Sequence, residues 1–109
     1  MARVLVPLAE GCEELEAVTI IDLLRRAGVE VVTAGLADGP VHASRGVVLL
    51  PDRNLDEVLG DEFDMIVLPG GLPGADHLDA DPRIHTLLQR MAEQDRFTAA
   101  ICAALWGVA

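Results

Sequence analysis

The sequence predicts an α/β fold, with a parallel sheet and helices on its faces. Short apolar runs rich in Val, Ile and Leu alternate with longer segments whose apolar residues recur at helical spacing. Gly, Pro or Asp bounds most of these runs, as is typical of buried strands. Alternating strands and helices favour parallel pairing, because each helix carries the chain back to the edge where the next strand begins. With 109 residues, the chain is long enough for one domain.

The first half of the chain contains two predicted strands, a helix and a small hairpin. The run Val4-Leu5-Val6 indicates a buried strand, and the next segment has acids at its start, arginines at its end and Gly28 as its stop. In chain order we expect a strand at 3–7, a helix at 13–27, a strand at 29–34, a turn at 38–40 and a hairpin with arms at 41–43 and 46–50.

The second half repeats the alternation. Its clearest element is an amphipathic helix in which Pro82 fits the first position and an apolar face recurs at helical spacing. We expect a short helix at 55–59, a strand at 64–68, a sharp loop at 70–74, a helix at 82–94 and a strand at 97–101. Only seven residues follow Cys102, all apolar or Gly, so we expect residues 1–109 to form a single, incomplete domain.

The charge balance excludes whole classes of partner. Eight arginines face 18 acids, which gives a net charge of −10, and Tyr is absent. Nucleic-acid binding needs a basic surface and often stacking aromatic residues, so we expect no nucleic-acid partner. Anionic membranes are disfavoured for the same reason, and no apolar run approaches the roughly 18 residues of a membrane span. Two cysteines cannot form a disulfide scaffold, so we expect a reducing, cytoplasmic location.

Cys102 is the first candidate for chemistry. It follows the last predicted strand and precedes two alanines, and a nucleophile at a tight strand-to-helix turn needs such small neighbours. A helix beginning there would lower the thiol pKa. The alternative is a buried cysteine that acts as a small hydrophobic residue.

Glu16 is the second candidate. It shares a predicted helix row with Ile20, Leu23 and Ala27, so we expect its carboxyl to be buried in an apolar stripe and to favour the protonated form. Such a carboxyl can donate a hydrogen bond to a thiolate or act as a general acid or base. The alternative is an acid that stabilises the helix dipole, as we expect of Glu13 and Glu14.

Backbone donors complete the candidate site. Gly71, after a buried strand, and Ala103, after the cysteine, could together form an oxyanion hole, although a Gly-Gly pair is also a common turn. Arg45, in a turn, is either solvated or an anion clamp. No pair of histidines has metal-ligand spacing, so we expect no metal. We also expect no cofactor, because three acids at 9–14 would repel the phosphate of a flavin or nucleotide.

In this combination and order, the motifs resemble the ThiJ/PfpI family, in the branch of the parkinsonism-associated protein deglycase. The first matching stretch reads Leu-Ala-Glu-Gly-Cys-Glu-Glu-Leu-Glu. The matches fall at residues 8–16, 22–28, 44–47, 51–52, 64–71 and 99–103, which correspond to the N-terminal part of family members. The tail 104–109 is unlike the family. None of the three histidines matches the histidine that members carry near the cysteine.

The resemblance implies a flavodoxin-like three-layer sandwich with a mostly parallel sheet, here truncated. It also implies a nucleophile at Cys102, a protonated partner at Glu16 and backbone oxyanion donors at Gly71 and Ala103. Arg26 and Arg45 match arginines near the family's pocket. The family is usually dimeric. The helix at 13–27 is apolar over more of its circumference than one packed face needs. We therefore expect a homodimer or a complementing C-terminal piece.

Two functions are consistent with the same candidate residues. The first is a cysteine-dependent enzyme of glyoxalase or deglycase type, acting on reactive carbonyls such as methylglyoxal or on glycated side chains. The second is a redox-sensing or chaperone-like stress protein in which Cys102 oxidises to a sulfinic acid stabilised by Glu16. A flavodoxin-like nucleotide-binding module is a third, weaker hypothesis.

Overall fold

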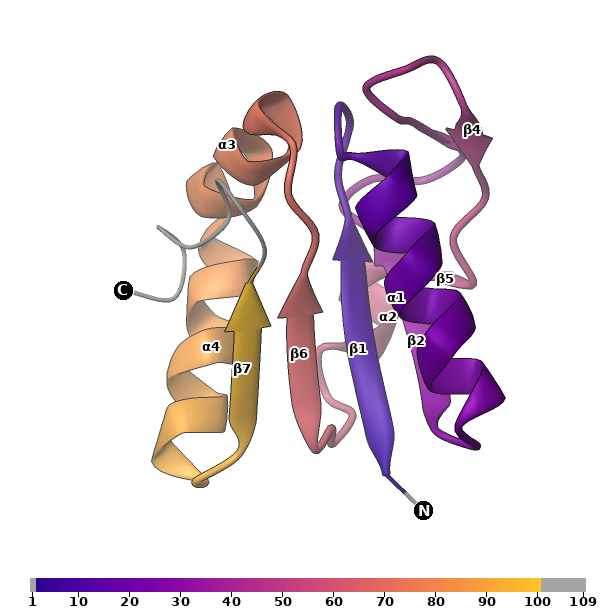
Figure 1. Ribbon diagram of the computed structural model, residues 1–109. Coiled ribbons are helices and arrows are strands. Elements are labelled where there is room, and N and C mark those ends of the chain that lie inside the picture. The colour runs from indigo at the N-terminus through magenta and orange to yellow at the C-terminus, as the bar shows by residue number, and fades with distance from the viewer. Residues whose placement is uncertain (1, 101–109) are drawn as a thin grey trace.

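The computed structural model of the chain describes residues 2–100 and forms an α/β sandwich around one parallel sheet (Figure 1). The strand order is β5-β2-β1-β6-β7, and every neighbouring pair is parallel. The strands are β1 (Arg3–Leu8), β2 (Glu30–Gly35), β5 (Arg53–Asn54), β6 (Met65–Leu68) and β7 (Phe97–Ala100). A separate antiparallel hairpin pairs β3 (Val41–His42) with β4 (Val48–Leu49).

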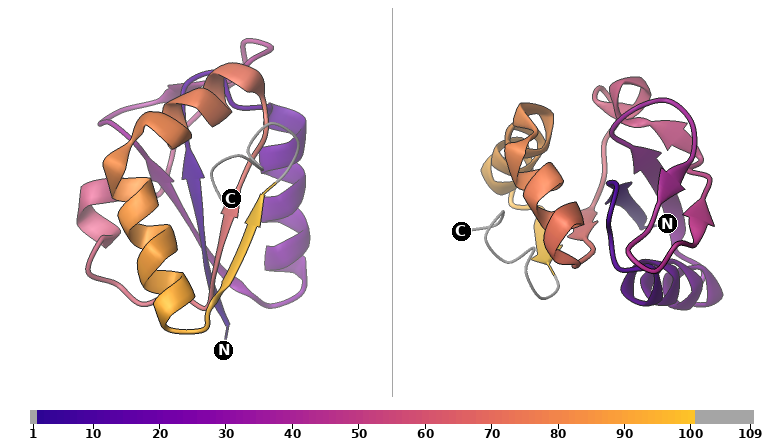
Figure 2. Two further views of the ribbon diagram at one scale, coloured as in Figure 1. Left: turned by 90° about the vertical axis from the view of Figure 1, so that its left-hand side faces the viewer. Right: turned by 90° about the horizontal axis from the view of Figure 1, so that it is seen from above.

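Helices cover both faces of the sheet, which confirms the predicted three-layer arrangement. One face is covered by α1 (Glu14–Arg26) and the hairpin. The other carries α2 (Leu55–Val58), α3 (Leu72–Ala80) and α4 (Pro82–Glu93). The view from above in Figure 2 shows α1 well separated from the α3–α4 pair.

The central strand β1 belongs to both halves of the core. Leu5 and Ala9 join the buried cluster under α2, α3 and α4, whereas Val4, Val6 and Leu8 join the cluster under α1. Side chains alternate between the faces of a strand, so β1 must be apolar on both sides when both faces are covered. This requirement explains the continuous apolar run from which the strand was predicted.

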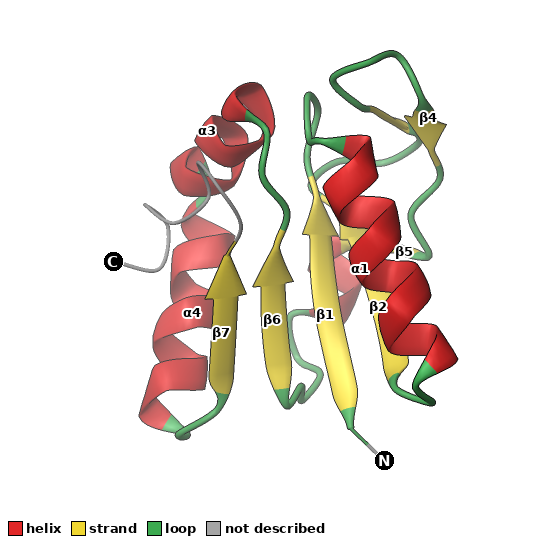
Figure 3. Cartoon of the chain, viewed as in Figure 1, coloured by secondary structure: helices red, strands yellow, loops and turns green. Residues whose placement is uncertain are grey.

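The start of one helix and one short strand were not predicted. The segment 70–74 was expected to be a loop, but helix α3 begins at Leu72, with Gly71 as its N-cap and Pro73 in its first turn. Pro is tolerated there because the first N–H groups of a helix have no intrahelical partner. The closely spaced Gly and Pro residues therefore gave no sign of a helix start. Figure 3 shows helix α3 at this position. The two-residue strand β5 is too short to give a periodic signal.

The other predicted elements occur, with small differences at their ends. Helix α1 occupies all but the end residues of 13–27, and α4 ends at Glu93 rather than at residue 94. The hairpin arms shorten to two residues each. The predicted last strand extended to Ile101, which lies outside the described residues.

Candidate functional site

The candidate site lies at the carboxyl edge of the sheet, between β1 and β6. The strand order reverses at this point, because β2 pairs with one side of β1 and β6 with the other. In open α/β sheets, ligands bind in the crevice where the order reverses. The loop that follows β1 and the loop that follows β6 meet here.

Glycines let these two loops pack backbone against backbone. A Cβ at Gly71 would lie 2.7 Å from the Glu13 nitrogen, and one at Gly74 would lie 2.6 Å from the Cys12 Cα. Gly71 also has a φ of +94°, which side chains rarely adopt. The Glu13 N–H donates to the Gly70 carbonyl at 3.0 Å. The loops are thereby fixed against each other.

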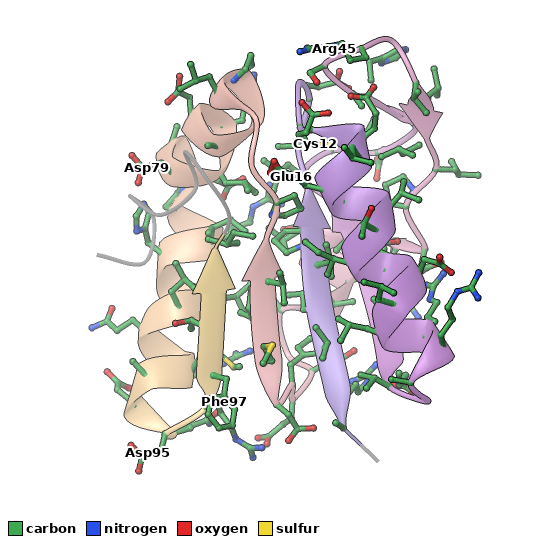
Figure 4. All side chains as sticks on the ribbon, viewed as in Figure 1. Cys12, Glu16, Arg45, Asp79, Asp95 and Phe97 are labelled. Carbon is green, nitrogen blue, oxygen red and sulfur yellow. The ribbon has the colours of Figure 1, made fainter. Side chains whose placement is uncertain are left out.

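Glu16 is held at this junction. The Gly70 backbone N–H donates to Glu16 Oε1 at 3.2 Å, so the first turn of α1 is tied to the loop after β6. Figure 4 shows Glu16 beside Cys12 at the upper end of α1, near the end of β6. The contact fixes one oxygen of the carboxyl and orients the group at the crevice, as an acid–base residue requires.

The predicted environment of Glu16 is partly wrong. Leu23 is 60% exposed and Ala27 is also exposed, so their row is not a buried stripe. The buried side of α1 runs instead through Ala17, with Ile21 and Leu24 packed against the same core. Glu16 is therefore half-buried at the edge of that side. Its partial burial comes from the junction with the β6 loop and not from an apolar row along the helix.

Cys12 lies in the same junction but in a different environment. Its side chain is fully buried, and its backbone contacts Gly74. Burial, with a smaller contribution from the negative charge of Glu14, raises the pKa of the Cys12 thiol. Cys12 therefore carries little thiolate at neutral pH and acts as a core residue.

Glu14 has a role that the sequence did not indicate. Its carboxylate accepts hydrogen bonds from Ser44 Oγ at 2.9 Å, from the Arg45 N–H at 2.9 Å and from the Val47 N–H at 3.3 Å. Partial desolvation would raise the pKa of Glu14, but these bonds and its own backbone N–H outweigh it and hold the pKa below the usual range. Glu14 thus fastens the hairpin turn to the first turn of α1.

The two candidate anion-binding arginines lie at opposite ends of α1. Arg45 is exposed in the hairpin turn above the first turn of the helix (Figure 4). Arg26 is in the last turn, where its Nε donates to Asp22 at 2.9 Å. Ten residues of helix, about 15 Å, separate Arg26 from Glu16. Within one chain, Arg45 lies at the same end of α1 as Glu16, and Arg26 lies at the opposite end.

The predicted nucleophile Cys102 and the predicted donor Ala103 lie outside the described residues. Gly71, the other predicted donor, is at the junction next to the Gly70–Glu16 contact. Within residues 2–100, no three His, Cys, Asp or Glu side chains are grouped so that they could hold a metal ion. Nor does that part of the chain contain a helix long and apolar enough to cross a membrane.

Comparison with known proteins identifies the architecture. The chain is 46% identical over 101 residues to Protein dj-1beta of Drosophila melanogaster, and this match covers 92% of the chain and 54% of the relative. It is 37% identical over 102 residues to the Caenorhabditis elegans protein named Glutathione-independent glyoxalase DJR-1.2, covering 94% of the chain and 54% of that relative. The chain thus spans about half the length of these curated relatives.

A solved structure agrees with the fold. The structure titled "Toxoplasma gondii DJ-1, oxidized" matches with a TM-score of 0.93 and 43% identity, over 95% of this chain and 57% of that one. The family description DJ-1/PfpI matches residues 2–109. The resemblance seen in the sequence motifs is therefore confirmed, and the chain belongs to the DJ-1/PfpI family.

Proposed function

We propose that the chain carries the cysteine-dependent site of an enzyme that acts on reactive carbonyls, such as methylglyoxal or its adducts on side chains. The observation that carries the proposal is the Glu16 carboxyl, held by the Gly70 N–H at the carboxyl edge of the sheet. The strand β7 ends at the same edge, at Ala100, two residues before Cys102 in the sequence. The name of the Caenorhabditis elegans relative supports the choice of substrate.

The proposed chemistry begins with addition of the Cys102 thiolate to the aldehyde carbon, which gives a hemithioacetal. Glu16 protonates the carbonyl oxygen and then transfers a proton between the two carbons of the former dicarbonyl. The backbone N–H groups of Gly71 and Ala103 are the proposed donors to the developing oxyanion. The former aldehyde carbon is then a thioester of Cys102, and water cleaves its C–S bond to release the hydroxy acid and the cysteine thiolate. The aldehyde carbon is oxidised and the ketone carbon reduced, so no external oxidant or cofactor is needed.

Arg45 supplies positive charge to this proposed site. Glu14 holds the backbone N–H of Arg45, and the Arg45 side chain lies exposed at the same end of α1 as Glu16. An arginine there would attract the carboxylate product or an anionic adduct. Arg26 is left out of the proposed site because it lies at the other end of the helix.

The second candidate function is redox sensing through oxidation of Cys102 to a sulfinic acid. One observation favours it: a structurally similar relative is titled as oxidized. The two functions would share Cys102 and Glu16, since a carboxyl that transfers protons can also donate a hydrogen bond to a sulfinate. Turnover of a dicarbonyl separates them.

The proposal includes a cytoplasmic homodimer. Leu15 and Val18 on α1 are 72% and 46% exposed, and Val48 and Leu50 of the hairpin strand and its exit are 55% and 81% exposed. Glu14 fastens the first turn of α1 to the hairpin turn, so the two elements that carry these side chains are held together. Apolar groups exposed on this scale are typical of an interface with another chain.

The test is turnover of methylglyoxal without glutathione, followed by lactate formation. We expect Cys102→Ser to reduce turnover to the background rate, because serine is a much weaker nucleophile at neutral pH. Cys12→Ser is the matched control and should retain most activity if the chain remains folded. Full turnover by Cys102→Ser, in a preparation freed of other glyoxalases, would refute the proposal.

A further inference from the structure

A cleft lies on the other side of β1 from the Glu16 junction. It is an open cleft of about 560 Å³ between the ends of β1 and β2, the start of β3 and the junction of α3 with α4. Small-molecule sites range from roughly 300 to 1,000 Å³, so the cleft has the size of a ligand site. Glu16, Gly70 and Gly71 do not line it.

The floor of the cleft is apolar and already ordered by the core. Leu8, Ala9 and Val41 line it and are each less than 5% exposed. Ala80 and Pro82 add apolar surface where α3 meets α4. A floor built from buried strand ends needs no rearrangement to receive an apolar group, which favours binding.

The charges that line the cleft are unbalanced. Glu10, Asp38 and Asp81 are acids, Arg83 is the only arginine among the lining residues, and the remaining ionisable group is His77. With the histidine neutral, the lining residues carry a formal charge of −2, from three acids and one arginine. The net charge of −10 on the whole chain adds to this negative field.

Arg83 is already committed to structural contacts. Its guanidinium donates twice to Asp81, once to Asp56 at 2.9 Å and once to the Leu36 carbonyl at 2.7 Å. This bidentate pairing neutralises both the arginine and Asp81. Arg83 is therefore poorly placed to receive an anionic ligand.

Neither of the other two acids pairs with an arginine in the described part of the chain. The His42 backbone N–H donates to Glu10 Oε2 at 3.1 Å, with the His42 ring 3.4 Å away, and Asn54 Nδ2 donates to Asp38 at 2.6 Å. The backbone and amide donors are neutral, so they orient the carboxylates without cancelling the negative charge. Both acids are exposed at the rim, above an apolar floor.

We propose that this cleft binds a small organic cation, namely a primary amine on an apolar body. The apolar part would cover Leu8, Ala9 and Val41, and the ammonium group would lie at the rim of the cleft, on the side of Glu10 or Asp38. Charge complementarity selects a cation over an anion, and the apolar floor selects an amine with a hydrocarbon body over a bare metal ion. The proposal does not depend on Cys102 or on the proposed enzymatic function.

Three probes of nearly equal shape test the proposal: 4-phenylbutylamine, 4-phenylbutanol and 4-phenylbutyrate. Each is titrated into the chain, and binding is followed by the amide shifts of Ala9, Ala37 and Ala80 in NMR spectra. We expect the amine to bind about fivefold more tightly than the alcohol, and the carboxylate more weakly than both. The advantage of the amine should shrink when salt rises from about 50 mM to about 500 mM.

Two variants locate the interaction. Glu10→Gln with Asp38→Asn should lower amine affinity to that of the alcohol while leaving alcohol binding unchanged. Ala80→Phe should fill the cleft and remove binding of both. Asp76→Asn makes the same acid-to-amide change on α3, outside the lining residues, and should bind like the unaltered chain.

Equal affinities for amine, alcohol and carboxylate would overturn the proposal, as would shifts confined to residues outside the cleft. Circular dichroism confirms that each variant is folded. Cys102→Ser should bind the amine normally, so failure of the proposed enzymatic function and failure of this proposal give different results.

Discussion

The Glu16 carboxyl accepts a hydrogen bond from the Gly70 backbone N–H at 3.2 Å and thereby joins α1 to the loop after β6. The two residues are 54 positions apart in the chain. The bond takes one carboxyl oxygen and fixes the direction of the group. Glu16 therefore has both a structural role and a proposed chemical role. A substitution that keeps the hydrogen bond from Gly70 but removes the acid can separate the two roles.

Glu16→Gln is that substitution. Glutamine keeps a carbonyl oxygen for the Gly70 N–H but cannot exchange a proton, so we expect the fold to persist and dicarbonyl turnover to fall about 100-fold or more. Thermal melting and methylglyoxal turnover measure the two effects. Glu16→Ala, which loses the bond as well, should also lower the melting temperature. A Glu16→Gln chain that melts early but turns over normally would assign Glu16 a structural role only.

The glycine contacts at the loop junction predict a stability effect. Gly71→Ala would place a Cβ 2.7 Å from the Glu13 nitrogen at a φ of +94°, so we expect it to lower the free energy of unfolding by at least about 2 kcal/mol. Gly74→Ala should act similarly, because its Cβ would lie 2.6 Å from the Cys12 Cα. Urea denaturation measures both.

Gly60→Ala is the control for these substitutions. Apart from its chain neighbours, no atom would lie within 4 Å of a Cβ added at Gly60, and its φ is ordinary. Alanine should therefore be neutral or slightly stabilising there. If Gly71→Ala proves as stable as Gly60→Ala, the two loops cannot be packed as closely as described.

Most of the fold follows from local patterns. Strands β1 and β6 are apolar on both faces because helices cover both sides of the sheet, and that requirement is visible in the sequence as an unbroken apolar run. The start of helix α3 was missed because it combines Gly71, Pro73 and Gly74, residues that usually end helices. These glycines are required by contacts with the loop after β1, which a local sequence pattern does not reveal.

The candidate site was only partly predictable for the same reason. The position of Glu16 in the first turn indicated its approximate place, but its partner, the Gly70 N–H, lies across the crevice and leaves no periodic signal. Glu14 looked like an ordinary first-turn acid, yet it binds three donors of the hairpin turn. Long-range hydrogen bonds to backbone groups depend on topology and not on residue type.

Glu14 also predicts a pH dependence. Its pKa in the folded chain is lowered from the usual 4.5, so its contribution to stability is full above about pH 4.5 and is lost as pH falls through the lower folded value. At neutral pH we expect the unaltered chain to have a higher melting temperature than Glu14→Gln. The difference should vanish in acid. Arg83 also lowers the pKa of Asp81. This effect is the same in the unaltered chain and in Glu14→Gln, so it cancels from the difference between their melting temperatures. Glu93→Gln, an exposed acid at the end of α4, should show no such dependence.

The two cysteines should differ in oxidation. Burial raises the pKa of the Cys12 thiol, so little reactive thiolate forms there, whereas we expect Cys102 to be activated. Mild peroxide treatment followed by peptide mass mapping should therefore place added oxygens on Cys102 first. Glu16→Gln should slow that oxidation. Preferential oxidation of Cys12 would contradict both assignments.

The exposed apolar side chains of α1 predict self-association. Leu15 and Val18 leave much of their surface in water, and burial against a second copy would remove that cost. We expect sedimentation at micromolar concentration to show a dimer, and Leu15→Glu with Val18→Glu to give a folded monomer of 11.6 kDa, since exposed positions tolerate charge but an apolar interface does not. Leu72→Glu alters a leucine that is 63% exposed on α3 and should leave the dimer intact. An unaltered chain that sediments as a monomer and melts cooperatively would show that this surface needs no partner chain.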